Sequence, residues 1–389
     1  MKDFKFLQPK YLVNTYPNRG LTFVAGEGVH LIDISGERYL DMMANYGVNI
    51  FGYSPSSVNE KLIHQLSRVS VLHGSFNNDT RALAAMRLVK RCGGGLNKVH
   101  FSNSGAEAIE SALKFAVLAT GKKKFIACRN GYHGKTLGAL SATAGRSYRG
   151  PFEPLLWTFH TIGYGDTARL ERAADGDTAA LLLEPIQGEG GIAIPHKGYL
   201  REAKEICASR NMLMIVDEIQ TGNGRTGHFL ASGQEGLAYD ILCLGKGLAG
   251  GIPVGATLVS ADIAEKIPRK IHTSTFGGNP LAAAGISATL DLLDEDMLRH
   301  IQETGAYFLE RLKSLSSGLI SQVRGRGLMI GIELKDKRDK VLQFLQRQKI
   351  LAAPAAHNVI RFLPPYIIEK GHIDHVTGTM ERALKDFQD

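Results

Sequence analysis

Apolar residues gather in short continuous runs along the middle of the chain, separated by glycine-rich breaks. Between residues 97 and 260, these runs alternate with segments whose apolar residues recur at helical spacing. Strands buried on both faces of a sheet have such runs, so the pattern predicts a mostly parallel sheet covered by helices. The predicted strands are 98–102, 124–128, 179–184, 212–217, 240–244 and 254–259, and the predicted helices are 105–120 and 198–210.

The rest of the chain predicts a second, smaller unit. Asn279-Pro280 opens a predicted helix that reaches about residue 293. After it we expect a helix at about 297–316, a strand at 326–334, a helix at 338–348, strands at 350–353 and 358–362, and a helix from 371. Alternation in residues 21–39, with a turn at 33–37, predicts N-terminal strands that pack with this unit. We expect an α/β protein with a large domain, residues 46–284, and a smaller α+β domain, residues 1–45 with 285–389.

Composition excludes several classes of protein. The 389 residues carry a net charge of +8, but the basic residues are dispersed except for Lys122-Lys123-Lys124 after Gly121, so we expect no nucleic-acid partner. No apolar run approaches the roughly 20 residues of a membrane span, and the start lacks a secretory signal, which favours a cytoplasmic enzyme. The four cysteines and thirteen histidines show no metal-ligand spacing, so we expect buried thiols and no metal site.

The candidate chemistry begins with an aspartate and a lysine. Asp217 ends the apolar run Met-Ile-Val, and Lys246 follows the next strand within Leu-Gly-Lys-Gly-Leu. A pyridoxal phosphate (PLP) enzyme needs this combination, because the lysine forms an imine with the cofactor and the carboxylate keeps the pyridine nitrogen protonated. Either residue alone fits an ordinary loop lysine or helix cap, so the interpretation depends on the other segments.

Three further segments supply binding groups. Ser104 and Gly105 follow a predicted strand and begin a predicted helix. The free amides at this helix N-terminus either bind a phosphate or belong to an ordinary capped helix. Tyr132 follows another strand and is placed either to stack on a flat ring or to close the edge of the core. Glu189 lies in the glycine-rich loop after the predicted strand 179–184, and it is either a carboxylate of the active site or a solvated loop charge.

Taken together, these segments resemble the class III (ornithine/ω-) aminotransferases of the type I PLP fold. The resemblance runs from about residue 14 to the C-terminus, and its motifs occur in order at the family's spacing. They are Ser-Asn-Ser-Gly-Ala-Glu-Ala, Tyr-His-Gly-Lys-Thr, Glu-Pro-Ile-Gln-Gly-Glu-Gly-Gly, Val-Asp-Glu-Ile-Gln-Thr-Gly, Gly-Lys-Gly, Thr-Phe-Gly-Gly-Asn-Pro and Arg-Phe-Leu-Pro-Pro. The acetylornithine and putrescine aminotransferases are the most similar members in these motifs.

The resemblance implies a role for each matching residue. Lys246 would be the Schiff-base lysine and proton shuttle, and Asp217 the partner of the pyridine nitrogen. The other cofactor contacts would come from Ser104, Gly105 and Ala106 on the phosphate, Gln220 on the ring hydroxyl, Ile219 and Tyr132 on the two ring faces, and Thr275 on the phosphate of the neighbouring subunit. The enzyme would therefore be a homodimer with shared active sites.

Arg361 and Glu189 would select the substrate. A planar guanidinium binds a carboxylate bidentately, and Arg361 ends the extended segment Asn358-Val359-Ile360. The resemblance implies that Glu189 masks this arginine while the amino donor is bound and gives way to a dicarboxylate acceptor. The expected reaction is a ping-pong transfer from an amine, diamine or ornithine-like donor to 2-oxoglutarate or pyruvate.

Two positions bear on which amino donor the enzyme uses. Lys135 stands where many relatives that act on ornithine-like donors have an arginine that holds the donor's α-carboxylate, and the lysine resembles putrescine aminotransferases. Tyr46 matches a pocket position that is aliphatic in many relatives and aromatic in ornithine aminotransferases, or it is a core tyrosine near a turn. The alternatives are an acetylornithine-type enzyme of arginine or lysine biosynthesis, an aminomutase or decarboxylase of the same fold, and a non-catalytic binding protein. Intact Lys246 and Asp217 argue against the last.

Overall fold

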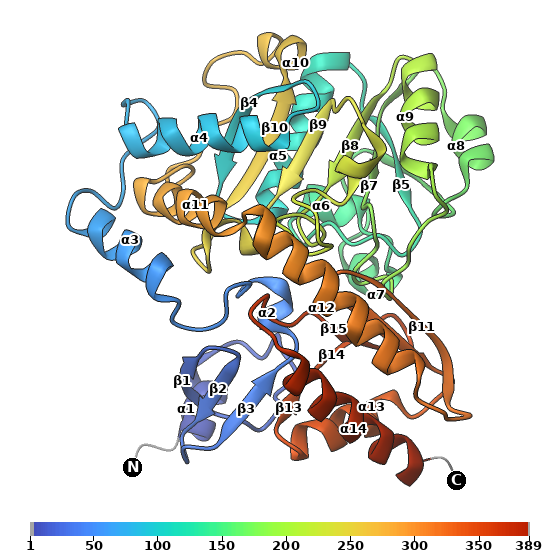
Figure 1. The fold of residues 1–389 in the computed structure, drawn as a ribbon. Coiled ribbons are helices and arrows are strands. Elements are labelled where there is room, and N and C mark those ends of the chain that lie inside the picture. The colour runs from blue at the N-terminus through green and yellow to red at the C-terminus, as the bar shows by residue number, and fades with distance from the viewer. Residues whose placement is uncertain (1–3, 388–389) are drawn as a thin grey trace.

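The continuous apolar runs form a seven-stranded sheet at the centre of the larger lobe of the computed structural model, which describes residues 4–387 (Figure 1). The order across the sheet is β4 (Leu96–Ser102), β10 (Gly255–Ser260), β9 (Ile241–Leu244), β8 (Leu213–Asp217), β7 (Thr178–Leu183), β5 (Lys124–Cys128) and β6 (Thr158–Ile162). β10 runs antiparallel to both of its neighbours, and the other pairs are parallel. The six predicted strands are confirmed. The edge strand β6 was missed because its sequence, Thr-Phe-His-Thr-Ile, is half polar.

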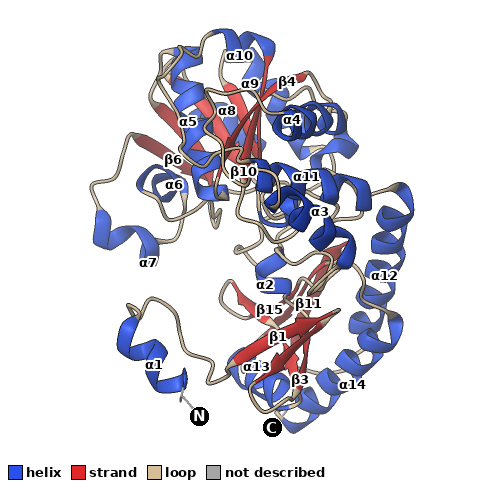
Figure 2. Cartoon of the chain, turned by 90° about the vertical axis from the view of Figure 1, so that its left-hand side faces the viewer, coloured by secondary structure: helices blue, strands red, loops and turns tan. Residues whose placement is uncertain are grey.

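Alternate residues of the central strands face two separate cores. Leu181 and Leu183 of β7 lie in one core, whereas Ala180 and Leu182 lie in the other. The first core also contains residues of α4 (Asp79–Cys92), α8 (Thr167–Ala173), α9 (Tyr199–Ser209) and α11 (Pro280–Leu292). The second contains residues of α5 (Gly105–Thr120), α6 (Leu137–Ala142) and α10 (Ala261–Glu265). The sheet is thus covered on both faces, as Figure 2 shows, and the type I fold class is confirmed.

The smaller lobe contains two four-stranded sheets. One has the order β1 (Phe23–Glu27), β2 (His30–Asp33), β3 (Arg38–Asp41), β13 (Ile350–Leu351), and the other β11 (Ile320–Arg326), β12 (Met329–Leu334), β15 (Val359–Phe362), β14 (Ala353–Ala355). β3 pairs with β13, which joins the two ends of the chain as predicted. The strand predicted at 326–334 is confirmed as β12, but it begins only at Met329. The chain turns at Gly327, whose φ is +54°, and the preceding strand β11, which forms a hairpin with β12, was not predicted.

The remaining helices cover the smaller lobe, connect it to the larger one or pack against helices of the larger lobe. They are α1 (Phe4–Tyr11), α2 (Ala44–Gly47), α3 (Ser56–Leu66), α7 (Arg146–Arg149), α12 (Glu295–Lys313), α13 (Arg338–Arg347) and α14 (Lys370–Asp386). Those that pack against helices of the larger lobe are α3 and α7. The predicted domain boundaries lie within α2 and α11, near the places where the chain passes between the lobes, and the division itself stays a prediction (Figure 1). Within residues 4–387, no helix is both long enough and apolar enough to span a membrane.

Candidate active site

The carboxyl ends of the parallel strands bring the candidate residues to one edge of the sheet, where ligands of such sheets bind. Asp217 is the last residue of β8, and Lys246 begins a short 3₁₀ turn after β9. Gly245, just before the lysine, lies so close to the first turn of α5 that an added Cβ would come within 3.3 Å of Gly105 and of the Ile219 side chain. These glycines therefore let three segments meet around Lys246.

The environment of Lys246 suits a nucleophilic amine. Burial lowers the pKa of the Lys246 ammonium, and the negative charge of Asp217 opposes this effect without cancelling it. A lysine with a lowered pKa has more of the neutral amine that attacks a carbonyl carbon.

Asp217 has a histidine partner. Nδ1 of His133 lies 2.7 Å from Oδ2 of Asp217, and the backbone N–H of Ile219 donates to Oδ1 at 3.0 Å. Burial by itself would lower the pKa of His133, but the hydrogen bond and the charge of Asp217 outweigh it, so the pKa is raised. The histidine thus fixes the carboxylate with a charge-assisted hydrogen bond at the carboxyl end of β8.

Glu184, just after β7, connects two loops of the site. Its Oε1 accepts the backbone N–H of Tyr132 at 3.0 Å, and its Oε2 accepts the backbone N–H of Gly188 at 3.1 Å. Burial raises the pKa of Glu184 to about 7, with His133 opposing this rise and Asp217 adding to it. One carboxyl group therefore sets the position of the loop that carries Tyr132 and the loop that carries Glu189.

Arg361 enters from β15 of the smaller lobe. Its side chain is fully buried, and it donates to Oε1 of Glu189 at 2.7 Å and to Oε1 of Gln220 at 3.0 Å. The Glu189 side chain is 30% exposed. Gly188 makes room for Gln220, because an added Cβ would overlap the amide of that side chain. The structure thus joins a buried cation to a carboxylate that solvent can reach.

The N-terminus of α5 supplies an anion site beside Lys246. Ser104 caps this 16-residue helix, accepting the backbone N–H of Glu107 at 3.2 Å. The first amides of a helix have no intrahelical partner and carry partial positive charge, so Gly105 and Ala106 suit a phosphate.

Tyr132, Tyr148 and Lys135 form the rim of the site. The rings of Tyr132 and Tyr148 pack edge to face at 5.8 Å, and the Lys135 ammonium lies 5.1 Å from the centre of the Tyr148 ring. Lys135 is exposed, so it reaches the site only through these two rings.

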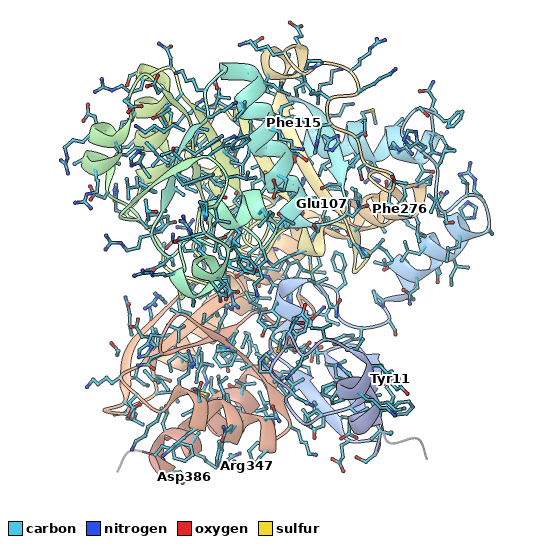
Figure 3. The ribbon with its side chains drawn as sticks, turned by 180° about the vertical axis from the view of Figure 1, so that it is seen from behind. Tyr11, Glu107, Phe115, Phe276, Arg347 and Asp386 are labelled. Carbon is cyan, nitrogen blue, oxygen red and sulfur yellow. The ribbon has the colours of Figure 1, made fainter. Side chains whose placement is uncertain are left out.

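Thr275 and Tyr46 are the other predicted residues at the edge of the site. Thr275 is exposed on the loop that contains Phe276, which Figure 3 shows on the same face of the larger lobe as Glu107 of α5. Tyr46 is 39% exposed, and its ring centre lies 5.6 Å from the Arg361 guanidinium carbon, so the alternative of a core tyrosine was wrong.

Comparison with known proteins decides the family. Residues 13–384 match the family described as Aminotransferase class-III. The chain belongs to the class-III aminotransferases. It is therefore an enzyme that transfers amino groups, and the family implies PLP as the cofactor.

The similarity to individual class-III aminotransferases extends over nearly the whole chain. An acetylornithine aminotransferase of Methanopyrus kandleri is 41% identical over 98% of this chain and 99% of its own. A LysW-aminoadipate semialdehyde transaminase of Deinococcus radiodurans is 37% identical over 97% of this chain and 89% of its own. The ornithine aminotransferase of Toxoplasma gondii, solved with partial occupancy of PLP at its active site, superposes with a TM-score of 0.93. It is 33% identical and covers 99% of this chain and 95% of its own.

The residues of this aminotransferase fit PLP. Asp217 at the end of β8 would provide a carboxylate for a ring nitrogen, Lys246 would provide the amine, and the capped N-terminus of α5 would provide amides for the phosphate. Gly105 and Gly245 have no side chain, so their backbones can approach each other and the Ile219 side chain closely. PLP would supply the electron sink for the reaction.

Sequence reasoning assigned no role to two residues of the site. His133 lies in the motif Tyr-His-Gly-Lys-Thr and Glu184 begins the motif Glu-Pro-Ile-Gln-Gly-Glu-Gly-Gly. The available signal was a carboxylate directly after β7 and a histidine in the loop after the neighbouring strand β5, which brings both side chains to one edge of the sheet. The contact of Gln220 with Arg361 was also missed.

Proposed function

We propose that this enzyme transfers the amino group of an acetylornithine-like donor to 2-oxoglutarate, as a homodimer with PLP held on Lys246. The bond between Glu189 and Arg361 carries the proposal. A buried guanidinium that already has a carboxylate partner can exchange it for the carboxylate of an acceptor without being left unpaired. The acetylornithine aminotransferase of Methanopyrus kandleri supports the choice of donor.

The chain's own residues would divide the reaction as follows. Asp217, held by His133, keeps a proton at the pyridine nitrogen. Lys246, with its lowered pKa, would take the proton from the donor carbon on its amine and hold it for return. Glu189 covers Arg361 while the donor is bound, and it swings toward solvent when the dicarboxylate acceptor enters.

Diamine donors such as putrescine are the second candidate, favoured by Lys135. Lysine lacks the bidentate fork with which arginine holds an α-carboxylate. Lys135 is exposed and lies over the Tyr148 ring, so it contributes little to the choice between the two donors.

The deciding experiment is a donor panel with the purified holoenzyme. N-acetylornithine, ornithine, putrescine and cadaverine are each assayed with 2-oxoglutarate and with pyruvate, in the wild type and in Lys135→Arg. We expect N-acetylornithine with 2-oxoglutarate to have the highest kcat/KM, and no turnover in Lys246→Ala. If the wild type prefers putrescine and Lys135→Arg reverses this preference, the donor is a diamine and the proposed acetylornithine-like donor is wrong.

A further inference from the structure

The turn that carries Tyr46 has an unusual backbone. Four successive residues have positive φ: Ala44 (+44°), Asn45 (+51°), Tyr46 (+59°) and Gly47 (+85°). Left-handed backbone is unfavourable for L-residues with a side chain, and a run of three such residues before a glycine is rarely tolerated. Contacts outside the turn must therefore hold it.

Asp41 makes those contacts from the end of β3. It is 1% exposed, and its Oδ1 accepts the backbone N–H of Met43 at 2.9 Å and that of Ala44 at 3.1 Å. Its Oδ2 accepts the hydroxyl of Tyr53 at 2.5 Å. The Tyr53 ring packs over Gly26, where an added Cβ would lie 2.6 Å from the ring. The carboxylate is thus fixed by Tyr53 on one side and holds the start of the turn on the other.

The turn is also tied to the strand that carries Arg361. The backbone N–H of Leu363, two residues after Arg361, donates to the carbonyl of Met42 at 2.8 Å. This bond and the left-handed turn bring the Tyr46 ring to the guanidinium. Arg361 therefore has Glu189 and Gln220 as polar partners and an aromatic ring beside them.

We propose that Asp41 and Tyr53 are positioning residues for acceptor binding, because they hold the turn that keeps Tyr46 on Arg361. This inference rests on the proposed exchange of carboxylates at Arg361. During that exchange, Glu189 has left and the acceptor has not fully bound, so the buried cation is poorly compensated. The face of an aromatic ring attracts a cation, most strongly where water is excluded, and it stabilises the guanidinium at that moment.

Glutarate is the probe for the test. It carries the two carboxylates of the acceptor but no keto group, so it binds without reacting. Its affinity for the holoenzyme is measured by calorimetry in wild type, Asp41→Asn, Tyr53→Phe and Tyr46→Ala, each first checked for native circular dichroism. We expect each substitution to weaken glutarate binding by roughly threefold to tenfold, the range of a single cation–π contact. Tyr53→Phe keeps the test decisive if Asp41→Asn does not fold.

Two comparisons separate positioning from a general structural role. In the Tyr46→Ala background, Tyr53→Phe should cause no further loss of affinity. Replacing Ala44 and Asn45 by glycine in Asp41→Asn should restore most of the affinity, because glycine adopts positive φ readily. Asp33→Asn is the matched control: Asp33 also accepts two backbone N–H groups, from Ser35 and Glu37, but in an exposed turn between β2 and β3.

The outcomes distinguish this inference from the proposed function. If Arg361→Lys leaves glutarate affinity unchanged, the carboxylate exchange itself is wrong. If Arg361→Lys weakens binding while folded Asp41→Asn and Tyr53→Phe bind glutarate as wild type does, only the positioning role is wrong. The positioning role is also wrong if Tyr53→Phe lowers the affinity for glutarate equally in the wild type and in Tyr46→Ala. The same holds if glycine at positions 44 and 45 restores no affinity to Asp41→Asn.

Discussion

At the scale of single residues, Arg361 is the most constrained side chain of the site. It is buried and bound to Glu189 and Gln220 at the same time, and its Nε has no hydrogen-bond partner among the described residues. A buried guanidinium that loses its carboxylate is costly, so whichever substrate brings a second carboxylate gains affinity there. The partly exposed Glu189 is the partner that can move.

We predict that Arg361→Ala weakens binding of the acceptor more than binding of the amino donor. The loss should be about 2–5 kcal/mol for 2-oxoglutarate, because its carboxylate would be left without a partner in a buried place. Separate kinetics of the two half-reactions measure this as a large rise in the KM for 2-oxoglutarate and a small change for the amino donor. Arg38→Lys, in an exposed ion pair with Glu27, is the control. Equal losses in both half-reactions would rule out a role in selecting the acceptor.

At the scale of elements, the site depends on strands that end next to one another. β7 and β8 are adjacent and parallel, so Glu184 and Asp217, at their carboxyl ends, lie at the same edge. Glu184 then holds the loop after β5 and the loop after β7 with one hydrogen bond each. Because both loops share one carboxyl group, a change in its protonation affects both sides of the site.

We predict that Glu184 makes stability depend on pH once the cofactor has been removed. Burial raises its pKa from an ordinary 4.5 to about 7 in the folded protein. A group with a raised folded pKa stabilises the fold fully below its unfolded pKa, and this contribution is lost as the pH rises through the folded value. The apoprotein should therefore lose thermal stability between about pH 4.5 and pH 7, and Glu184→Gln should lose less.

Thermal unfolding across this pH range, followed by circular dichroism, provides the measurement. Glu381→Gln, on the exposed face of α14, is the control and should match the wild type. The raised pKa of His133 acts in the same direction, so the difference between wild type and Glu184→Gln is the relevant quantity. Identical slopes in the two proteins would show that Glu184 stays ionised over this range.

At the scale of the whole molecule, one face of the larger lobe presents apolar side chains to solvent. Phe76 and Phe276 are 63% and 55% exposed, and they lie on neighbouring loops, because Arg81 donates to the carbonyls of both Phe76 and Gly278. Leu83 and Met86 of α4 are exposed as well. Exposed apolar groups that gather on one face are typical of an interface.

We predict that a second copy of the chain covers this face and that Thr275 reaches the partner's phosphate site. Phe276→Glu should give a monomer in light scattering and should bind PLP more weakly, because the neighbouring loop would no longer complete the site. Val24→Glu changes an exposed apolar residue of β1 in the smaller lobe and should leave the dimer intact. A wild-type enzyme that is monomeric and active at assay concentration would contradict the prediction.

The sequence by itself determined the sheet, the family and the local chemistry. Continuous apolar runs between glycine-rich breaks predict buried parallel strands, and Asp217 and Lys246 are recognisable because each lies just after such a run. These features are local: a strand, a cap or a turn depends on the residues within a few positions of it. The edge strand β6 and the hairpin at Gly327 were not predicted, because a half-polar strand and a two-residue turn leave only a weak local pattern.

Only the tertiary structure decided which distant side chains meet. Arg361 contacts Gln220, 141 residues away, and Asp217 contacts His133, 84 residues away. The pairing of Arg361 with Glu189 was implied by the family resemblance and by no local pattern. Such pairs depend on strand order and on how the smaller lobe packs against the larger one, and no local pattern carries that information. The left-handed turn at Tyr46 is the clearest case. Three non-glycine residues favour another backbone conformation, and the buried carboxylate of Asp41, which also bonds Tyr53, accepts the N–H groups at the start of the turn in this one.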